Sequence, residues 1–228
     1  MSVLIIGNGY DLSMGMSTSY SDYLKSDFFI SLTENNSIAK YLHNQFNHSP
    51  NWFDLEYNLG KYSFENENIN SIRQEFNCIL ESIKKFLNNT RVNIDKNTIS
   101  YDLVKSFIGQ GQIWVFNYTE TVEATFQSLY RTDNPKDYIK HIHGDLISGE
   151  IIVGTDDTQK IPSHHACLKK ASFRIYNPKE FKRQIFADNH IIIFGHSLGI
   201  SDSFYFQDLF DHIMAERSVD EYRIQIYF

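Results

Sequence analysis

Short apolar runs that end on glycine or polar residues recur along this chain, and they predict the strands of a central sheet. The first run covers residues 3–6 and stops at the turn Gly7-Asn8-Gly9. Mostly β-branched residues before such a turn are typical of a buried strand that leads into a tight loop. Runs at residues 113–116, 138–142, 151–153 and 191–194 end in the same way, and residues 223–228 predict a closing strand.

A helical pattern separates the first run from the others. Residues 19–22 form a capping box that opens a helix running towards Phe29. From about residue 31 to residue 107 the chain is polar and rich in asparagine, and its clearest amphipathic stripe comprises Ile72, Phe76, Ile79, Leu80, Ile83, Phe86 and Leu87. We therefore predict one α/β domain over residues 1–228, of Rossmann type, with a mainly parallel central sheet, flanking helices and a helical insertion at about 31–107.

Two details refine this prediction. Ser148-Gly149 lies between two apolar runs and predicts a hairpin, so the sheet is not expected to be purely parallel. Within the insertion, one helical face contains Trp52, Leu55, Leu59 and Tyr62, with Glu56 at its border and Asp54 turned away. If this segment is helical, Asp54 and Glu56 are not expected to share a two-carboxylate site.

The polar residues at the ends of the predicted strands are the candidates for a ligand site, because the carboxyl ends of parallel strands can gather at one edge of a sheet. Glycine in Gly7-Asn8-Gly9 lets backbone N–H groups approach a phosphate closely. A dinucleotide fingerprint requires a third glycine where Leu12 stands, so the stretch is either a nucleotide loop or an ordinary turn.

Two of the following strands end on residues that suit catalysis. Asn117 either binds a ligand hydroxyl or water, or caps the next helix, with Glu120 completing a capping box. His143 shares a strand face with His141, and a histidine near its ordinary pKa of about 6.5 is a natural base at neutral pH. A structural, hydrogen-bonded role is at least as good an interpretation of His141.

Other polar clusters have simpler interpretations. Asp156 and Asp157 either bind a ribose or cap a loop. His164 and His165 lie near Cys167, but their spacing matches no established metal site, and we expect a solvated loop and no bound metal.

Residues 195–199 match Gly-x-Ser-x-Gly, the nucleophile elbow of α/β-hydrolases, between a strand and a helix. The chain after Ser197 is short, and its one histidine, His212, lies inside a predicted helix beside Asp211. Too little sheet follows to hold the triad partners. We therefore prefer Ser197 as a hydroxyl that binds phosphate or ribose, and keep a serine hydrolase as a weaker alternative.

Composition narrows the class of protein. The 228 residues carry a net charge of −7 and show no cluster of Lys and Arg, which argues against a nucleic-acid surface, and no acidic metal cluster suggests a nuclease. Cys78 and Cys167 are isolated, so neither a disulfide framework nor a zinc ribbon is expected. No apolar run is long enough for a signal peptide or a membrane span, and we expect a reducing cytoplasm.

Several motifs, taken in order, resemble the bacteriophage abortive-infection AbiH family. They are residues 5–11, 18–20, 51–56, 116–119, 141–144, 154–157 and 194–202. The resemblance spans nearly the whole chain, although members often continue further at the carboxyl end, which leaves room for a terminal element. That family in turn resembles sirtuin-like domains, which bind NAD on a Rossmann-type sheet. The sirtuin zinc module is absent from this sequence, which disfavours protein deacetylation.

The resemblance implies an anti-phage effector that binds NAD and hydrolyses it to nicotinamide and ADP-ribose. Asn117 and His143 match the catalytic positions, with His143 as base. The nucleotide-binding positions are expected at Gly7, Asn8, Gly9, Asp11, Tyr118, Gly195, His196, Ser197 and Asp202. A nucleotide sensor that signals to a partner without catalysis is the alternative. We expect control by homo-oligomerisation, a regulatory partner or a phage-derived trigger.

Overall fold

A five-stranded parallel sheet forms the centre of the protein, as predicted for a Rossmann-type fold. The computed structural model describes residues 2–50, 53–66, 71–130, 134–215 and 222–227. The strands are β1 (Ser2–Ile6), β2 (Gly111–Val115), β3 (Ile139–His141), β6 (His190–Phe194) and β7 (Arg223–Tyr227). Their order in the sheet is β3-β2-β1-β6-β7. The strand order therefore reverses at β1, and such a reversal is where Rossmann-type sheets bind ligands.

The three central strands end at the same level. Ile6, the last residue of β1, lies opposite Val115 of β2 and Phe194 of β6. The loops that follow these strands therefore start side by side, at the carboxyl edge of the sheet.

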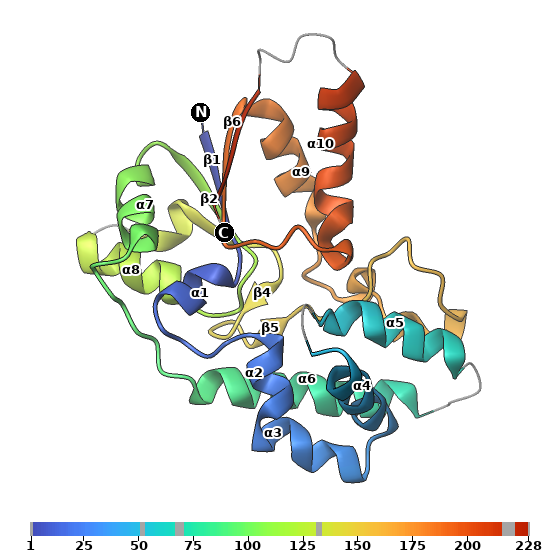
Figure 1. Ribbon diagram of the computed structural model, residues 1–228. Coiled ribbons are helices and arrows are strands. Elements are labelled where there is room, and N and C mark those ends of the chain that lie inside the picture. Colours follow the sequence, from blue (N-terminus) through green and yellow to red (C-terminus); the bar gives the residue numbers. More distant parts are fainter. Residues whose placement is uncertain (1, 51–52, 67–70, 131–133, 216–221, 228) are drawn as a thin grey trace.

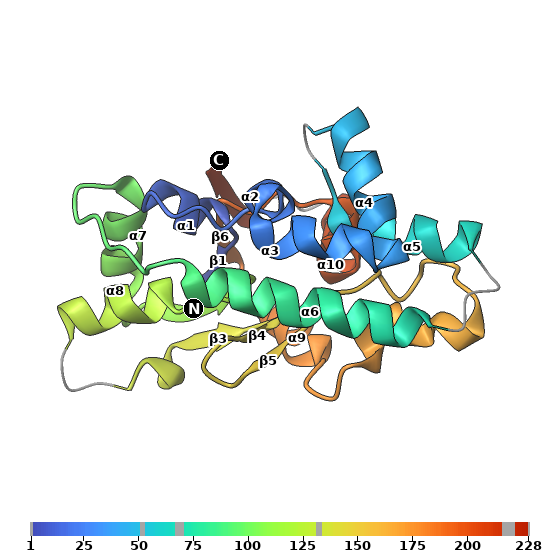
Figure 2. The ribbon, with the colours of Figure 1, turned by 90° about the horizontal axis from the view of Figure 1, so that it is seen from below.

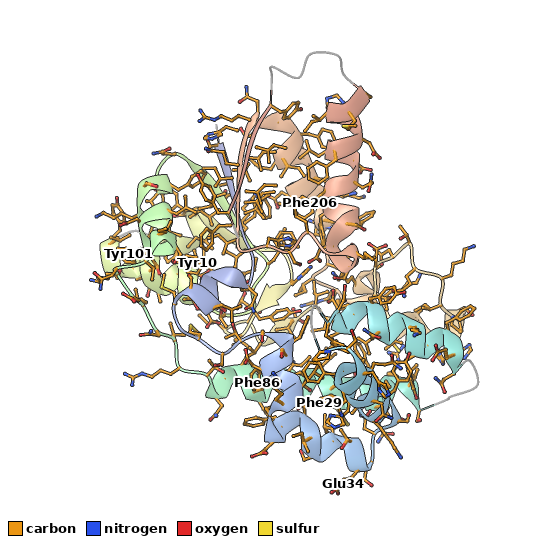
Figure 3. All side chains as sticks on the ribbon, in the orientation of Figure 1. Tyr10, Phe29, Glu34, Phe86, Tyr101 and Phe206 are labelled. Atoms are coloured by element: carbon orange, nitrogen blue, oxygen red, sulfur yellow. The ribbon has the colours of Figure 1, made fainter. Side chains whose placement is uncertain are left out.

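Helices cover both faces of the sheet because both faces are apolar. On one face lie α1 (Gly9–Ser13), α7 (Ile99–Phe107) and α8 (Thr121–Leu129), and on the other α9 (Pro178–Ala187) and α10 (Ser203–Ala215) (Figure 1). Alternate residues of β1 point to opposite faces, so Leu4 and Ile6 pack in one core and Val3 and Ile5 in the other. Figure 3 labels Tyr10 and Tyr101 on the first face and Phe206 on the second.

The remaining α-helices form what we call the helical lobe, which lies beyond the carboxyl edge of the sheet (Figures 1 and 2). It comprises α2 (Tyr20–Lys25), α3 (Asp27–Ile30), α4 (Ser37–His48), α5 (Leu55–Glu65) and α6 (Ile72–Asn89). Its core includes Phe29 (labelled in Figure 3), Leu42, Leu59 and Phe76. Ile151, Val153 and Leu168 join this core from the segment between β3 and β6. The lobe therefore covers the edge at which the strand loops gather.

Local sequence signals set most helix ends. The predicted capping box is present at α2, where Ser19 and Asp22 bond each other's backbone N–H groups. The helix does not run unbroken to Phe29, because Ser26 is extended and separates α2 from α3. The predicted amphipathic stripe is confirmed in α6, and Asp54 caps α5 through the N–H of Tyr57.

Two predictions about the central sheet were wrong: that the run at 151–153 belongs to it, and that it is not purely parallel. The run at 151–153 does not enter the central sheet, because Glu150–Ile151 (β5) pairs antiparallel with Gly144–Asp145 (β4). The predicted hairpin is confirmed, but it forms a separate two-stranded sheet, and all strand pairs described in the central sheet are parallel. The positive φ of Gly144 turns the chain at the start of this hairpin.

Some expectations cannot be compared with the fold. Trp52 and Phe228 lie outside the described residues.

Within the predicted insertion, α7 packs on the sheet rather than in the lobe, through Tyr101, Val104 and Phe107. None of the described helices is long and apolar enough to span a membrane.

The loops after β1 and β6 touch backbone to backbone. Gly7 N–H donates to Phe194 O (2.9 Å), and Gly9 N–H donates to Gly195 O (2.8 Å). A Cβ on Gly7 would lie 2.5 Å from His196 Cα, and one on Gly9 would lie 2.5 Å from Gly195 Cα. The two glycines are therefore required by the contact between the loops.

We predict that Gly9→Ala lowers the free energy of unfolding by about 1–3 kcal/mol or more, because backbone must move to admit the methyl group. Gly199→Ala is the matched control, since its Cβ would meet side chains and no backbone, with Ser197 Oγ at 3.3 Å and Asp54 Oδ2 at 3.9 Å. Urea denaturation of both variants measures the effect. Equal midpoints for Gly9→Ala and wild type would disprove the contact.

Candidate functional site

Asn117 lies at the carboxyl edge of the sheet, two residues after β2. Its side chain is buried, with 5% of the residue exposed, and neither its amide nitrogen nor its amide oxygen has a hydrogen-bond partner among the described residues. The residue that caps α8 is Glu120, and no side-chain cap is formed there. The capping-box interpretation of Asn117 is therefore wrong, and its amide is left for another partner.

Asp11 is a second buried group beside Asn117. It lies in α1, directly after the glycine turn, and its Oδ2 accepts from Thr119 Oγ1 (2.6 Å). Burial raises the pKa of Asp11 despite nearby hydroxyl groups and the Asn117 amide, which lower it. The amide is near Asp11 but not in hydrogen-bonding geometry, because Asp11 Oδ1 is also unpaired. Asp11 therefore pins the glycine loop to the β2 loop.

His141 holds the backbone of Asn117. Its Nδ1 lies 2.8 Å from the Asn117 carbonyl oxygen, and its Nε2 lies 2.7 Å from Glu123 Oε1. Both oxygens can only accept, so the ring must carry a proton on each nitrogen. Burial opposes this charge, but the Glu123 carboxylate and the carbonyl raise the pKa of His141 above its ordinary value. The structural interpretation of His141 is the one that this geometry favours.

His143 is buried between the sheet edge and α10. Its Nε2 lies 3.2 Å from the Tyr205 hydroxyl and 3.5 Å from Asp202 Oδ1. Burial and the nearby Lys170 ammonium lower the pKa of His143 to about 3, although the Asp202 carboxylate opposes this. The ring is therefore neutral at pH 7, and it is a weaker base than its ordinary pKa would make it.

Asp202 brings the polar groups of this edge together. It lies just before α10, and its Oδ2 is 3.4 Å from Nε2 of His196. The N–H of Leu198 donates to Nδ1 of His196, so the ring proton of a neutral His196 lies on Nε2 and points to Asp202. Despite burial, the Lys170 ammonium, with smaller contributions from the His143 and His196 rings, lowers the pKa of Asp202 far below its usual range. The site therefore contains an ionised carboxylate between two imidazoles.

Two members of this cluster, Lys170 and Glu56, were not predicted from the sequence. Lys170 Nζ lies 2.7 Å from Asp202 Oδ1 and 2.9 Å from Glu56 Oε2. Burial, with the Asp202 charge, raises the pKa of Glu56 above its ordinary value, although the Lys170 ammonium opposes this shift. For Glu56, the one signal in the sequence was its position at the border of the apolar face of α5. No pattern in the sequence pointed to Lys170, because it lies in an irregular segment without hydrophobic periodicity.

The other predicted binding residues lie around this cluster. The Tyr118 hydroxyl donates to Ile152 O (3.0 Å) and lies 3.3 Å from the Tyr20 hydroxyl. Asn8 accepts from Thr18 Oγ1 (2.8 Å). The amides of Gly7 and Gly9 donate to protein carbonyls, so a diphosphate would have to use other donors. Ser197 is exposed, beside Gly195.

The remaining candidates form local structure. Asp156 Oδ1 accepts from the N–H of Thr158 and caps a local turn, whereas Asp157 Oδ1 accepts from the N–H of Ala171 and joins two separate segments of the chain. His165 is buried against Ser63 Oγ (2.8 Å), so the expectation of a solvated loop was wrong at that residue. His212, the candidate triad histidine, packs against Phe186 and Tyr222. Within the described ranges, no three His, Cys, Asp or Glu side chains are arranged to hold a metal ion.

We predict that the His141–Glu123 pair stabilises the protein at low pH and not at high pH. The folded pKa of His141 is raised above its unfolded value of about 6.5, so the contribution is fully present below pH 6.5. It is lost as the pH rises through the raised pKa. The stability advantage of wild type over Glu123→Gln should therefore shrink between pH 6 and pH 9, as measured by urea denaturation.

Glu180→Gln is the control, because it removes a carboxylate from the surface pair with Lys140, which contains no histidine. Its stability difference from wild type should be nearly constant over the same pH range. A constant difference for Glu123→Gln as well would show that His141 is not charged in the folded protein.

Comparison with known protein families identifies the family of the chain. A search of curated proteins found no match. A family model described as bacteriophage abortive infection AbiH matches residues 3–108 and 60–222. These segments include the glycine loop, the loops after β2 and β3, and the ion-pair cluster of Glu56, Lys170 and Asp202. The chain therefore belongs to the AbiH family of bacteriophage abortive infection proteins.

Proposed function

We propose that this abortive-infection protein binds NAD at the carboxyl edge of its sheet, under the helical lobe, and hydrolyses it to nicotinamide and ADP-ribose. The place is supported by the reversal of strand order at β1. The chemistry is supported by Asn117, His143 and Asp202, which come from three different loops to that edge.

The unpaired amide of Asn117 is the observation that carries the proposal. A buried polar group without a partner costs about 1–3 kcal/mol. Both polar atoms of this amide are in that state, and Asp11 Oδ1 beside it is too. A ligand that offers both donors and acceptors, such as a ribose with its hydroxyl groups, would satisfy them.

The reaction breaks the bond between ribose C1′ and the nicotinamide nitrogen. The ring leaves as neutral nicotinamide, water adds to C1′, and the proton of that water passes to a base and then to solvent. Positive charge develops on the ribose, and the ionised Asp202 carboxylate would stabilise it. Asn117 would hold the ribose or the water. The neutral ring of His143 would accept the proton, which requires only a weak base because the attacked carbon is strongly electrophilic.

The adenosine half would lie towards the loop after β6. Ser197 has an exposed hydroxyl there, and His196 and Gly195 form the wall against the glycine loop. In this proposal Gly7, Gly9 and Asp11 shape the site rather than donate to the diphosphate.

One observation favours a second candidate function, a nucleotide sensor without catalysis. A general base works best when its pKa is near the working pH, and burial holds the pKa of His143 at about 3. A sensor would bind NAD or ADP-ribose tightly and leave it intact.

We predict that purified protein releases nicotinamide and ADP-ribose from NAD, measured by chromatography. His143→Ala and Asn117→Ala should each reduce the rate by about 100-fold or more, because general base help alone is typically worth this much. His48→Ala and Asn88→Ala are the matched controls, since both replace exposed side chains in the helical lobe. They should keep the wild-type rate.

Binding of NAD, measured by calorimetry, separates the two candidate functions. Tight binding without release would favour the sensor. Wild type that neither binds nor cleaves NAD would overturn the proposal. Equal rates for His143→Ala and wild type would exclude His143 as the base.

We also predict that Asn117→Ala is at least as stable to heat as wild type, although it loses NAD binding. The substitution removes two buried polar atoms that make no hydrogen bond in the free protein. Thr119→Val is the contrast, because Thr119 donates to Asp11, and its loss should lower the melting temperature. A clear loss of stability in Asn117→Ala would mean that the amide is paired within the protein.

A further inference from the structure

Lys170 is deeply buried near the site, with 2% of the residue exposed. Its ammonium faces three acceptors, which are Glu56 Oε2 at 2.9 Å, Asp202 Oδ1 at 2.7 Å and the Ser201 carbonyl oxygen at 2.8 Å. An ammonium has three N–H donors, so each has a partner. The lysine is therefore fully satisfied without a ligand.

The three charged residues come from parts of the chain that are far apart. Glu56 lies in the first turn of α5 in the helical lobe, and its Oε1 accepts from the N–H of Gly154 (3.0 Å). Lys170 lies between β5 and β6, and Asp202 lies directly before α10. The ion pairs therefore join the helical lobe to the carboxyl edge of the sheet at one point.

Asp202 Oδ1 is shared between Lys170 and His143, while Oδ2 faces His196. The contact with Lys170 is the shortest of the three, and it is charged on both sides. A charge-assisted hydrogen bond of this kind is about twice as strong as a neutral one. Lys170 therefore determines where the carboxylate lies relative to the two rings.

We propose that Lys170 is a positioning residue of this site, whose ammonium holds the Asp202 carboxylate between His143 and His196 and fixes the helical lobe against the sheet edge. The proposal deepens the proposed function, because it calls the cluster a ligand site. The contacts on which it rests do not depend on which ligand binds.

Lys170 does not act as a nucleophile in this arrangement. Burial alone would lower its pKa, but the Glu56 and Asp202 carboxylates raise the pKa of Lys170 above its ordinary value. The amine is thus protonated, and its lone pair is not available. Its effect passes through Asp202 and through the charge that it places near His143.

The surroundings of His143 predict the sign of that effect. The charged and titratable groups that influence or contact it are Lys170, Asp202, His196, His141, Tyr205 and Tyr118. Lys170, His196 and His141 disfavour a proton on the ring, and Asp202 favours one. Without the ammonium, the largest charge that opposes a proton on His143 is gone, whereas the Asp202 carboxylate that favours one remains.

The test follows protonation of His143 by NMR of its labelled imidazole in wild type and Lys170→Met, from pH 8 down to about pH 3, because the pKa of His143 in wild type is about 3. We expect the proton affinity of His143 to rise about tenfold or more in Lys170→Met, because a unit charge a few ångströms away is removed. Lys170→Arg keeps the cation and should restore the wild-type titration. Lys182→Met is the control, because it removes an ammonium from the pair with Asp208 at 2.9 Å and should leave His143 unchanged.

Removing one member of a buried ion cluster can prevent folding, so a second variant is needed. Glu56→Gln with Lys170→Met replaces both partners of one buried ion pair with neutral side chains. It should fold and show the same rise in the proton affinity of His143. A titration of His143 identical to wild type in either folded variant would overturn the proposal.

Calorimetry with NAD on the same samples distinguishes a failure of the Lys170 proposal from a failure of the NAD proposal. A shifted His143 titration in protein that does not bind NAD supports the positioning role and counts only against NAD as the ligand. An unshifted titration in protein whose NAD binding is intact counts only against Lys170.

Discussion

The backbone contact between the loops after β1 and β6 is the constraint on which the rest of the structure depends. Gly7 and Gly9 lie so close to Gly195 and His196 that no side chain fits between them. Hydrogen bonds from both glycines to Phe194 and Gly195 hold the two loops at the reversal of strand order. Every other polar group of the site is placed relative to this closed junction. The glycines therefore serve packing, although glycines at such a turn usually suggest phosphate binding.

Around that junction the protein tolerates two costly features. One is a buried cluster of a lysine and two carboxylates, which sets ionised Asp202 beside a neutral His143. The other is the unpaired amide of Asn117. Buried charge clusters and unpaired polar groups rarely improve stability over an apolar core. Their presence together at the ligand-binding edge of an α/β sheet is typical of a functional site rather than of a structural one.

The geometry also separates two histidines that look equivalent in the sequence. His141 and His143 are two residues apart, yet His141 is held charged by Glu123 and a carbonyl, whereas His143 is kept neutral by burial and Lys170. The first supports the backbone of Asn117, and the second faces Asp202. Neighbours distant in sequence, rather than position along the strand, therefore give the two rings different chemistry.

The sequence by itself determined the fold class, because apolar runs, capping residues and the stripe of α6 are local patterns with a period of their own. It also identified the glycine turn, Asn117, His143 and residues 195–202 as the ends of strands that meet. Only the tertiary structure decided that the predicted hairpin lies outside the central sheet, and that Glu56 and Lys170 join Asp202. These are contacts between residues far apart in the chain, and they depend on burial and charge in three dimensions, which no local period records.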